Sequence, residues 1–105
     1  MHVQVVNFNL KEMSVDEFHG VCDEVAPTFA AIPGLLAKVW LADEESNTYG
    51  GVYLWESREA MAEFAQSDLF AAVASNPHFA NLTARDYGVL EEHTRTTRGL
   101  VATAA

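Results

Sequence analysis

The chain has little of what secreted, membrane and nucleic-acid-binding proteins carry in quantity. Its single cysteine, Cys22, excludes an internal disulfide and suits a reducing compartment, so we expect a cytoplasmic protein. The 6 Lys and Arg residues against 15 Asp and Glu give a net charge of -9 and leave no positive footprint for phosphates, which argues against nucleic acid as a partner. No apolar run approaches the roughly 20 residues of a membrane helix, and no signal peptide is visible at the N-terminus.

Motifs that bind nucleotides, metals or acyl groups are also missing. No GxGxxG follows a strand, and neither a GxxxxGKS-type loop nor a GxSxG elbow occurs. The four histidines, His2, His19, His78 and His93, form no His-x-x-x-His spacing. We therefore expect a protein that uses neither a metal nor a cofactor.

The apolar half of the sequence predicts one folded domain at 1–92, followed by a C-terminal tail at 93–105 that is a candidate to reach a partner subunit. β-branched and aromatic runs predict strands over 2–9, 35–42, 49–56 and 82–92. Helical spacing predicts a helix before Pro33 and a second, two-part helix before Pro77. The order β-α-β-β-α-β is that of the α+β, ferredoxin-like fold, in which both helices cover one face of a four-stranded antiparallel sheet.

Serine residues mark the expected starts of the helices. Ser14 and Glu17 form a capping-box pattern, and Ser57 and Ser67 precede the two parts of the second helix. Pro27 falls inside the first helix, where it removes an amide donor. We expect a kink there, or a break after which Pro27 opens a short second turn.

Both faces of the middle strands are apolar. One face of the strand at 35–42 carries Leu35, Ala37, Val39 and Leu41, and the other carries Leu36, Lys38, Trp40 and Ala42. Two helices can cover only one face, and the other would be an apolar patch too large for a monomer. We therefore expect a homodimer that packs sheet against sheet.

Two segments on these strands resemble a known family. The runs PGLLAKVW at 33–40 and YGGVYLW at 49–55 are similar to the pattern of the YdhR-type monooxygenases. This family belongs to the dimeric α/β-barrel superfamily, together with antibiotic-biosynthesis monooxygenases. The segment 57–70 resembles the second helix of that superfamily, and the likeness covers 2–92. It implies a dimer whose two sheets form a barrel, and cofactor-independent oxygenation of a small molecule.

The haem-degrading relatives in the same superfamily allow a comparison at single residues. They use an Asn on the first strand, a Trp on the second helix and a His further along. Asn7 matches the first place, but Phe64 occupies the Trp place and Ala74 the His place. The resemblance therefore argues against a haem oxygenase of that type.

The candidate pocket residues are aromatic. Trp40, Tyr53, Trp55 and Tyr87 are candidate walls of a pocket between sheet and helices that binds a flat, apolar substrate. The alternative is that each is a plain core residue.

Three polar residues are candidates for chemistry. Asn7 and Lys38 interrupt apolar strands, so each needs a partner, a water or a wet cavity. Asn7 is a candidate donor to a carbonyl or enolate oxygen, His78 is a candidate general base, and Lys38 adds positive charge for the substrate. The alternatives are an ion pair inside the barrel for Lys38 and a solvated loop histidine for His78.

Together with the resemblance, these residues predict a cofactor-independent monooxygenase. Its substrate would be a small aromatic or polyketide-like molecule, which is deprotonated and then reacts with O2 in a dry pocket. Two alternatives use the same pocket: a binding protein without catalysis, and an isomerase or cyclase on the same fold. The fold alone does not separate these three functions.

Overall fold

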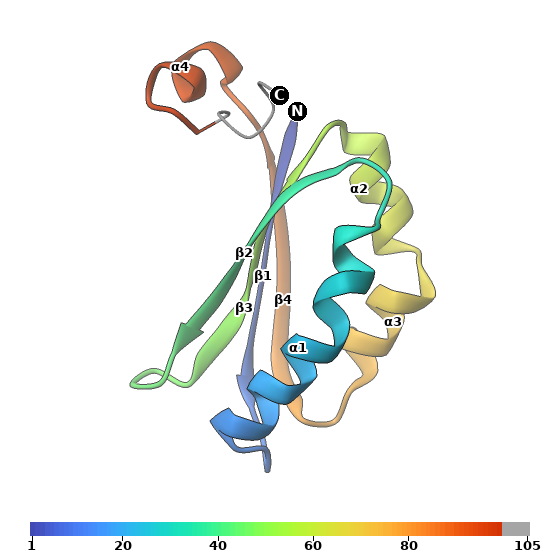
Figure 1. Ribbon diagram of the computed structural model, residues 1–105, viewed down its shortest axis with the longest axis vertical. Coiled ribbons are helices and arrows are strands. Elements are labelled where there is room, and N and C mark those ends of the chain that lie inside the picture. The colour runs from blue at the N-terminus through green and yellow to red at the C-terminus, as the bar shows by residue number, and fades with distance from the viewer. Residues whose placement is uncertain (100–105) are drawn as a thin grey trace.

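The computed structural model describes residues 1–99. Its elements are β1 (His2–Leu10), α1 (Val15–Ala30), β2 (Leu35–Asp43), β3 (Thr48–Trp55), α2 (Arg58–Ala65), α3 (Asp68–Ser75), β4 (Phe79–Gly88) and α4 (Glu91–Thr96). The helices α1, α2 and α3 cover one face of the sheet, and α4 lies beyond the end of β4 (Figure 1). The predicted ferredoxin-like α+β fold is therefore confirmed.

The four strands form one sheet in the order β2-β3-β1-β4, with each neighbouring pair antiparallel. Side chains of directly opposed residues share a face of the sheet. Val6 is opposite Gly51, which is opposite Trp40, and this row faces the helices. The next row, which includes Val52 and Val39, faces away from them. The register therefore decides which candidate residues can meet.

The predicted helix caps are all present. Ser14 Oγ accepts the Glu17 amide at 3.1 Å, and Glu17 Oε1 accepts the Ser14 amide at 2.9 Å, which completes the capping box. Ser57 Oγ accepts the Ala60 amide, and Ser67 Oγ accepts the Phe70 amide. These bonds satisfy amides that would otherwise lack a partner in the first turns.

Pro27 does not break the first helix. α1 continues through Pro27 to Ala30, so the predicted alternative of a break at that position is wrong. A proline removes one amide donor, and Pro27 stands in the last turn, where few later hydrogen bonds depend on it. The buried Phe18 and Phe29 at the two ends of the helix hold it on the sheet.

The last strand lies earlier in the chain than the predicted 82–92. It spans Phe79–Gly88, and its pairing with β1 shifts between Asn7 and Asn9. Asn81 in the same region has a positive φ of 56°, a local irregularity that obscures the start of the strand in the sequence. The helix α4 then crosses the predicted boundary between domain and tail, and positions 100–105 of that tail lie outside the described residues.

The core lies between the helices and the sheet. Phe8 stacks on Phe79 with ring centroids 4.3 Å apart, and Tyr53 lies parallel to Trp55 at 6.0 Å. The buried Trp55 donates its indole N–H to Oε1 of buried Gln4 at 3.2 Å. Aromatic rings from the strands and from α1 and α2 therefore fill most of this layer.

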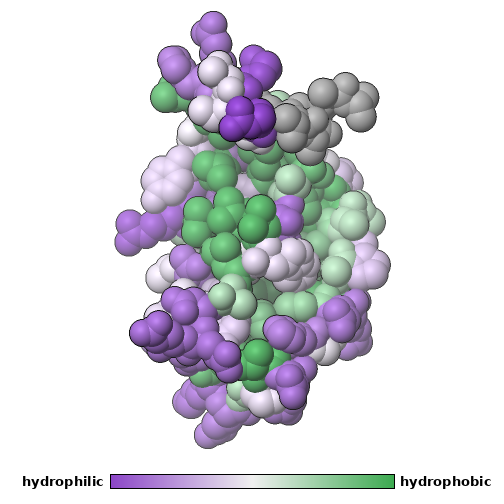
Figure 2. Space-filling view, turned by 60° about the vertical axis from the view of Figure 1, so that its left-hand side comes forward, coloured by the Kyte–Doolittle hydropathy of each residue, from purple (hydrophilic) through white to green (hydrophobic). Residues whose placement is uncertain are grey.

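The other face of the sheet carries apolar residues together with the polar Asn7, Thr83 and Arg85, and it is not covered by a helix of the described residues. The register places Val5, Val52, Leu54, Val39 and Tyr87 on it. Val39 is 58% exposed and Tyr87 is 52% exposed. Apolar side chains gather across the middle of the molecule on this side (Figure 2). We call these residues the open sheet face.

Within the described chain, no helix combines the length and apolar character needed to cross a membrane.

Candidate functional site

A cavity of about 160 Å³ lies between the sheet and the helices α1 and α3. Most of its lining is apolar: Val6, Phe8, Phe18, Val21, Val25, Phe29, Leu69, Val73 and Phe79. The polar lining groups are Lys38, Tyr53, Cys22 and Asn76. An apolar wall with a few placed polar groups is typical of a small-molecule site.

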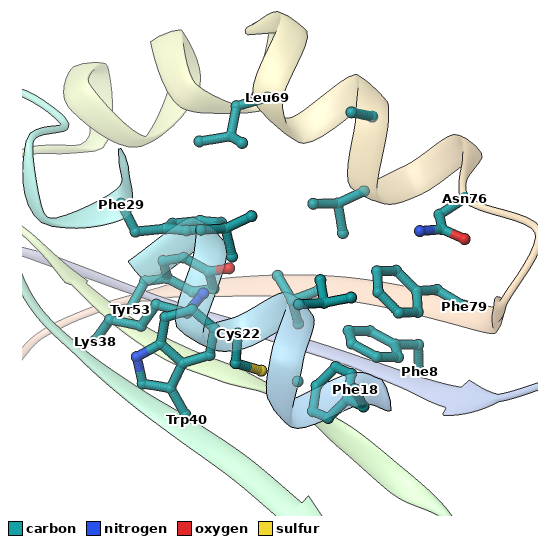
Figure 3. A pocket seen from close by; sticks show the side chains of 16 residues that line it. Phe8, Phe18, Cys22, Phe29, Lys38, Trp40, Tyr53, Leu69, Asn76 and Phe79 are labelled. Atoms are coloured by element: carbon teal, nitrogen blue, oxygen red, sulfur yellow. The ribbon is translucent and has the colours of Figure 1, made fainter. Parts of the chain in front are cut away.

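Lys38 is held against three aromatic rings at one end of the cavity. Its Nζ lies 3.4 Å from the ring centroids of Phe29 and Trp40 and 4.7 Å from that of Tyr53. Two of these rings come from the sheet and one from α1, so the surrounding fold fixes the position of the amine (Figure 3). We call this group of four residues the lysine cage.

Gly51 provides the space for Lys38. A Cβ added at Gly51 would lie 2.9 Å from Lys38 Cε, which is closer than such atoms pack. The missing side chain on β3 therefore lets the lysine run across its neighbour strand and reach the cavity. The Gly50-Gly51 pair thus contributes directly to the geometry of the site.

The cage removes water from the amine. Burial lowers the pKa of Lys38 to about 7, while the nearby Cys22 acts in the opposite direction. The ring faces attract an ammonium group and replace part of its hydration, but they carry no full negative charge. Burial raises the pKa of Cys22 and of Tyr53, so both stay protonated at neutral pH. Lys38 is therefore the group in the cage that can change its charge near neutrality.

Asn76 supplies the polar group at the other end of the cavity. It follows α3 directly, and its Oδ1 accepts the backbone N–H of His78 at 2.9 Å. This bond fixes the orientation of the amide, with its nitrogen turned toward the cavity (Figure 3). The sequence predicts Asn76-Pro77 as a helix end next to the presumed cavity mouth, but it does not identify Asn76 as a pocket residue.

Two of the four predicted aromatic walls line the cavity and two do not. Trp40 and Tyr53 are part of the lining, with Lys38. Trp55 faces the same side but is fully buried beneath it, with its N–H bonded to Gln4. Tyr87 lies opposite Val3 on the open sheet face, because side chains on a strand alternate between faces.

The predicted polar pair is not brought together by the fold. Asn7 shares a row with Gly50 and Thr83 on the open sheet face, whereas its neighbours Val6 and Phe8 line the cavity. The His78 ring lies outside the lining, with Nδ1 2.9 Å from the Lys11 carbonyl oxygen. His78 contributes to the pocket through its backbone amide, which orients Asn76.

The fold and the cavity define a small α+β protein with an aromatic-lined cavity between its sheet and helices. The chain matches the family described as "Putative mono-oxygenase ydhR" over residues 3–100, and it belongs to this family. The resemblance seen in the two strand segments is therefore confirmed. No curated protein matches the chain.

Solved structures share the fold. The chain is similar to SnoaB, a cofactor-independent oxygenase from Streptomyces nogalater, with 21% identity, a TM-score of 0.65 and coverage of 85% of this chain and 93% of that one. An antibiotic biosynthesis monooxygenase gives 16% identity and a TM-score of 0.69, covering 86% and 99%. The haem-degrader MhuD from Mycobacterium tuberculosis shares 22% identity with a TM-score of 0.68, and the match covers 86% of this chain and 96% of that one. At these identities the likeness concerns the fold alone.

The structure of the haem-degrader contains two haems in its active site. In the present chain, no histidine lines the cavity. Ala74, at the place where the haem-degrading relatives carry their His, stands on α3 with an exposed side chain. Within residues 1–99, no three Asp, Glu, His or Cys side chains gather in a metal-binding arrangement.

Proposed function

We propose that the protein is a cofactor-independent monooxygenase that oxidises a small aromatic or polyketide-like molecule with O2. The observation that carries this proposal is the aromatic cavity with a lysine amine fixed at one end. Membership of a monooxygenase family supports the reaction class, and the shared fold with a cofactor-independent oxygenase agrees with it.

The reaction suits a substrate with an acidic CH2 group between aromatic rings. Loss of one proton gives a stabilised carbanion, which reacts with O2 to form a peroxide. The peroxide then loses its second C–H proton and the O–O bond breaks, so that a carbonyl and water are formed. One oxygen atom enters the product and the other enters water, and the substrate supplies all four electrons.

The protein contributes binding and electrostatics to this chemistry. The buried Phe29 and the partly exposed Trp40 form apolar walls for a flat ring. Lys38 stands where positive charge stabilises an oxygen anion on the substrate. Tyr53 adds a neutral hydroxyl at the same end of the cavity.

We also propose that two copies associate through the open sheet face. Val39, Val52, Val5 and Tyr87 lie together on this face, and apolar surface of this kind is stabilised by burial. The proposed dimer would pack sheet against sheet, and the tail after position 92 is a candidate to contact the second copy. A single unpaired Cys22 suits a cytoplasmic location for this dimer.

Oxygen uptake with anthrone-like and quinol compounds tests the proposed reaction. We expect uptake together with a carbonyl product and a rise in melting temperature. A thermal shift without uptake or product would instead support a binding protein, and a product without uptake would support an isomerase or cyclase. Lys11→Met serves as a control, because Lys11 is the other lysine of the chain, is exposed just after β1 ends and does not line the cavity.

A further inference from the structure

We propose that Lys38 is the catalytic proton acceptor, and that the substrate is an aromatic molecule with a phenol or enol hydroxyl against Nζ and a second oxygen against Asn76. This inference rests on the proposed function and specifies its base and its substrate class. The geometry that supports it is the lysine cage at one end of the cavity and the fixed amide at the other (Figure 3).

Lys38 has no acidic partner among residues 1–99. Within residues 1–99, the ion pairs join the N-terminal amine to Glu91 and His2 to Asp86, and neither involves Lys38. Lys38 is half-buried, and an ammonium that has lost part of its hydration without gaining a carboxylate is destabilised. The missing negative charge can come from the substrate.

A hydroxyl at Nζ resolves this cost. When the O–H proton moves to the amine, an ammonium and an oxygen anion form side by side. Their attraction is strong in a cavity lined by hydrocarbon and aromatic groups. The charged pair is thus created inside the site, so neither ion has to be stripped of water in order to enter.

Lys38 is the group of the cage that can accept a proton, because its titratable neighbours stay protonated. The titratable groups that face it are the Cys22 thiol from α1 and the Tyr53 phenol from β3. Burial raises the pKa of both, so neither accepts a proton from a phenol near pH 7. With its pKa near 7, Lys38 is present in its neutral form in a substantial fraction of molecules, as a general base requires.

The proton and electron count closes over one turnover. In the enol form of the CH2 substrate, one of the two protons has moved to oxygen and the carbon keeps one C–H. This O–H bond breaks and an N–H bond forms on Nζ, while the electron pair spreads from the oxygen to that carbon. That carbon bonds to O2 and becomes a peroxide anion. The C–H proton then moves to the distal peroxide oxygen as the O–O bond breaks, which leaves a carbonyl and hydroxide. The Lys38 ammonium returns its proton to this hydroxide and gives water. Lys38 therefore ends as the neutral amine with which it began.

Asn76 determines which ligand atom can bind at the end of the cavity opposite Lys38. Its Oδ1 already accepts the His78 amide, so the part of the side chain that faces the cavity is a donor. A donor recognises a carbonyl or hydroxyl oxygen on the ligand. The cavity therefore selects a flat molecule with oxygen atoms at both ends and an apolar body between them.

A hydroxyanthraquinone dye tests this assignment without any turnover. Its absorbance reports whether the phenol is ionised when bound, and a titration of the bound dye gives the midpoint. We expect the midpoint to lie at least about one pH unit lower on the wild type than on Lys38→Met, a tenfold change in ionisation. Equal midpoints would overturn the inference. Lys11→Met should match the wild type, and Asn76→Ala should weaken dye binding without removing the ionisation.

Acylation of the two lysines gives an independent readout that needs no ligand. Only the neutral amine reacts with acetic anhydride, so trace labelling over pH followed by mass spectrometry gives the titration of each lysine. We expect Lys38 to be labelled as a neutral amine at lower pH than exposed Lys11. Identical profiles would overturn the assignment even if the dye does not bind or Lys38→Met does not fold.

Oxygen uptake by Lys38 variants distinguishes the role of Lys38 as a base from the monooxygenase reaction itself. In Lys38→Arg the cation is permanent and accepts no proton. The turnover rate of Lys38→Arg should therefore rise with pH as the free substrate ionises, and it should not follow the pH profile of the wild type. Oxygen uptake that is unchanged in Lys38→Met would overturn the base while leaving the monooxygenase intact. Dye ionisation that depends on Lys38, without oxygen uptake by any compound, would overturn the monooxygenase and leave the base.

Discussion

Gly51 on β3 lies directly beneath the side chain of Lys38 on β2, so that a single added methyl group would stand 2.9 Å from Lys38 Cε. The absence of a side chain at one position thus decides where the amine at the other is held. The pairing of β2 with β3, which sets Lys38 over a residue without a side chain, therefore positions the amine in the cavity.

Gly51→Ala should displace Lys38 with little effect on the fold. The closest contact is with a flexible side chain, although the Val39 carbonyl oxygen at 3.3 Å also leaves little room. Because misplacement of a positioned group by about 1 Å can lower turnover on the order of 100-fold, we expect a loss of about tenfold or more in kcat. Gly20→Ala on α1 is the matched control, since its Cβ would meet nothing within 4 Å. Full kcat in Gly51→Ala would contradict the role of this spacing.

Gly50→Ala should act on stability. Gly50 has a φ of +148°, and a Cβ there would lie 1.8 Å from the Val6 carbonyl oxygen on β1, where the backbone cannot easily move. A residue with a side chain in such a conformation costs on the order of 3 kcal/mol. Urea denaturation should show a loss of at least this size. A variant as stable as the wild type would mean that the two strands are further apart than described.

The stability of Lys38→Met relative to the wild type should depend on pH. Burial lowers the pKa of Lys38 to about 7 in the folded chain, whereas lysine in the unfolded chain keeps a pKa of about 10.4. Between these values the unfolded chain binds the extra proton, so the wild type gains stability as pH rises from about 7 to 10. The advantage of Lys38→Met in free energy of unfolding should be greater at pH 6 than at pH 9. An advantage of Lys38→Met that does not change with pH would contradict the shift.

Val39→Asp should dissociate the proposed dimer. Val39 is exposed on the open sheet face in one chain, and a carboxylate buried between two such faces would lose its hydration without a partner. Light scattering at micromolar concentration should give twice 11.5 kDa for the wild type and 11.5 kDa for the variant. Ala71→Asp adds the same charge on the exposed side of α3 and should remain dimeric. A monomeric wild type would contradict the dimer directly.

The sequence predicted the order of the elements because its signals are local. Ser14 with Glu17 marks a helix start through bonds within one turn, and alternation of apolar residues marks a strand. It did not predict which way each strand faces. Both faces are apolar, so nothing in the local pattern separates Asn7 on the open face from Val6 in the cavity.

The site was only partly predictable for the same reason. Lys38, Trp40 and Tyr53 were identified because a charge or a large ring interrupts an aliphatic strand. Asn76 was missed because its position depends on a bond from the His78 amide after α3 ends. The space above Gly51 depends on register between β2 and β3, which the sequence of either strand does not contain.

The most direct test of the account is oxidation under labelled oxygen, ¹⁸O2, with an anthrone-like phenol as substrate. We predict that the wild type places one labelled atom in the product carbonyl and that Lys38→Met loses most of this incorporation while remaining folded. A product that takes its oxygen from water, or equal incorporation by wild type and Lys38→Met, would contradict the account.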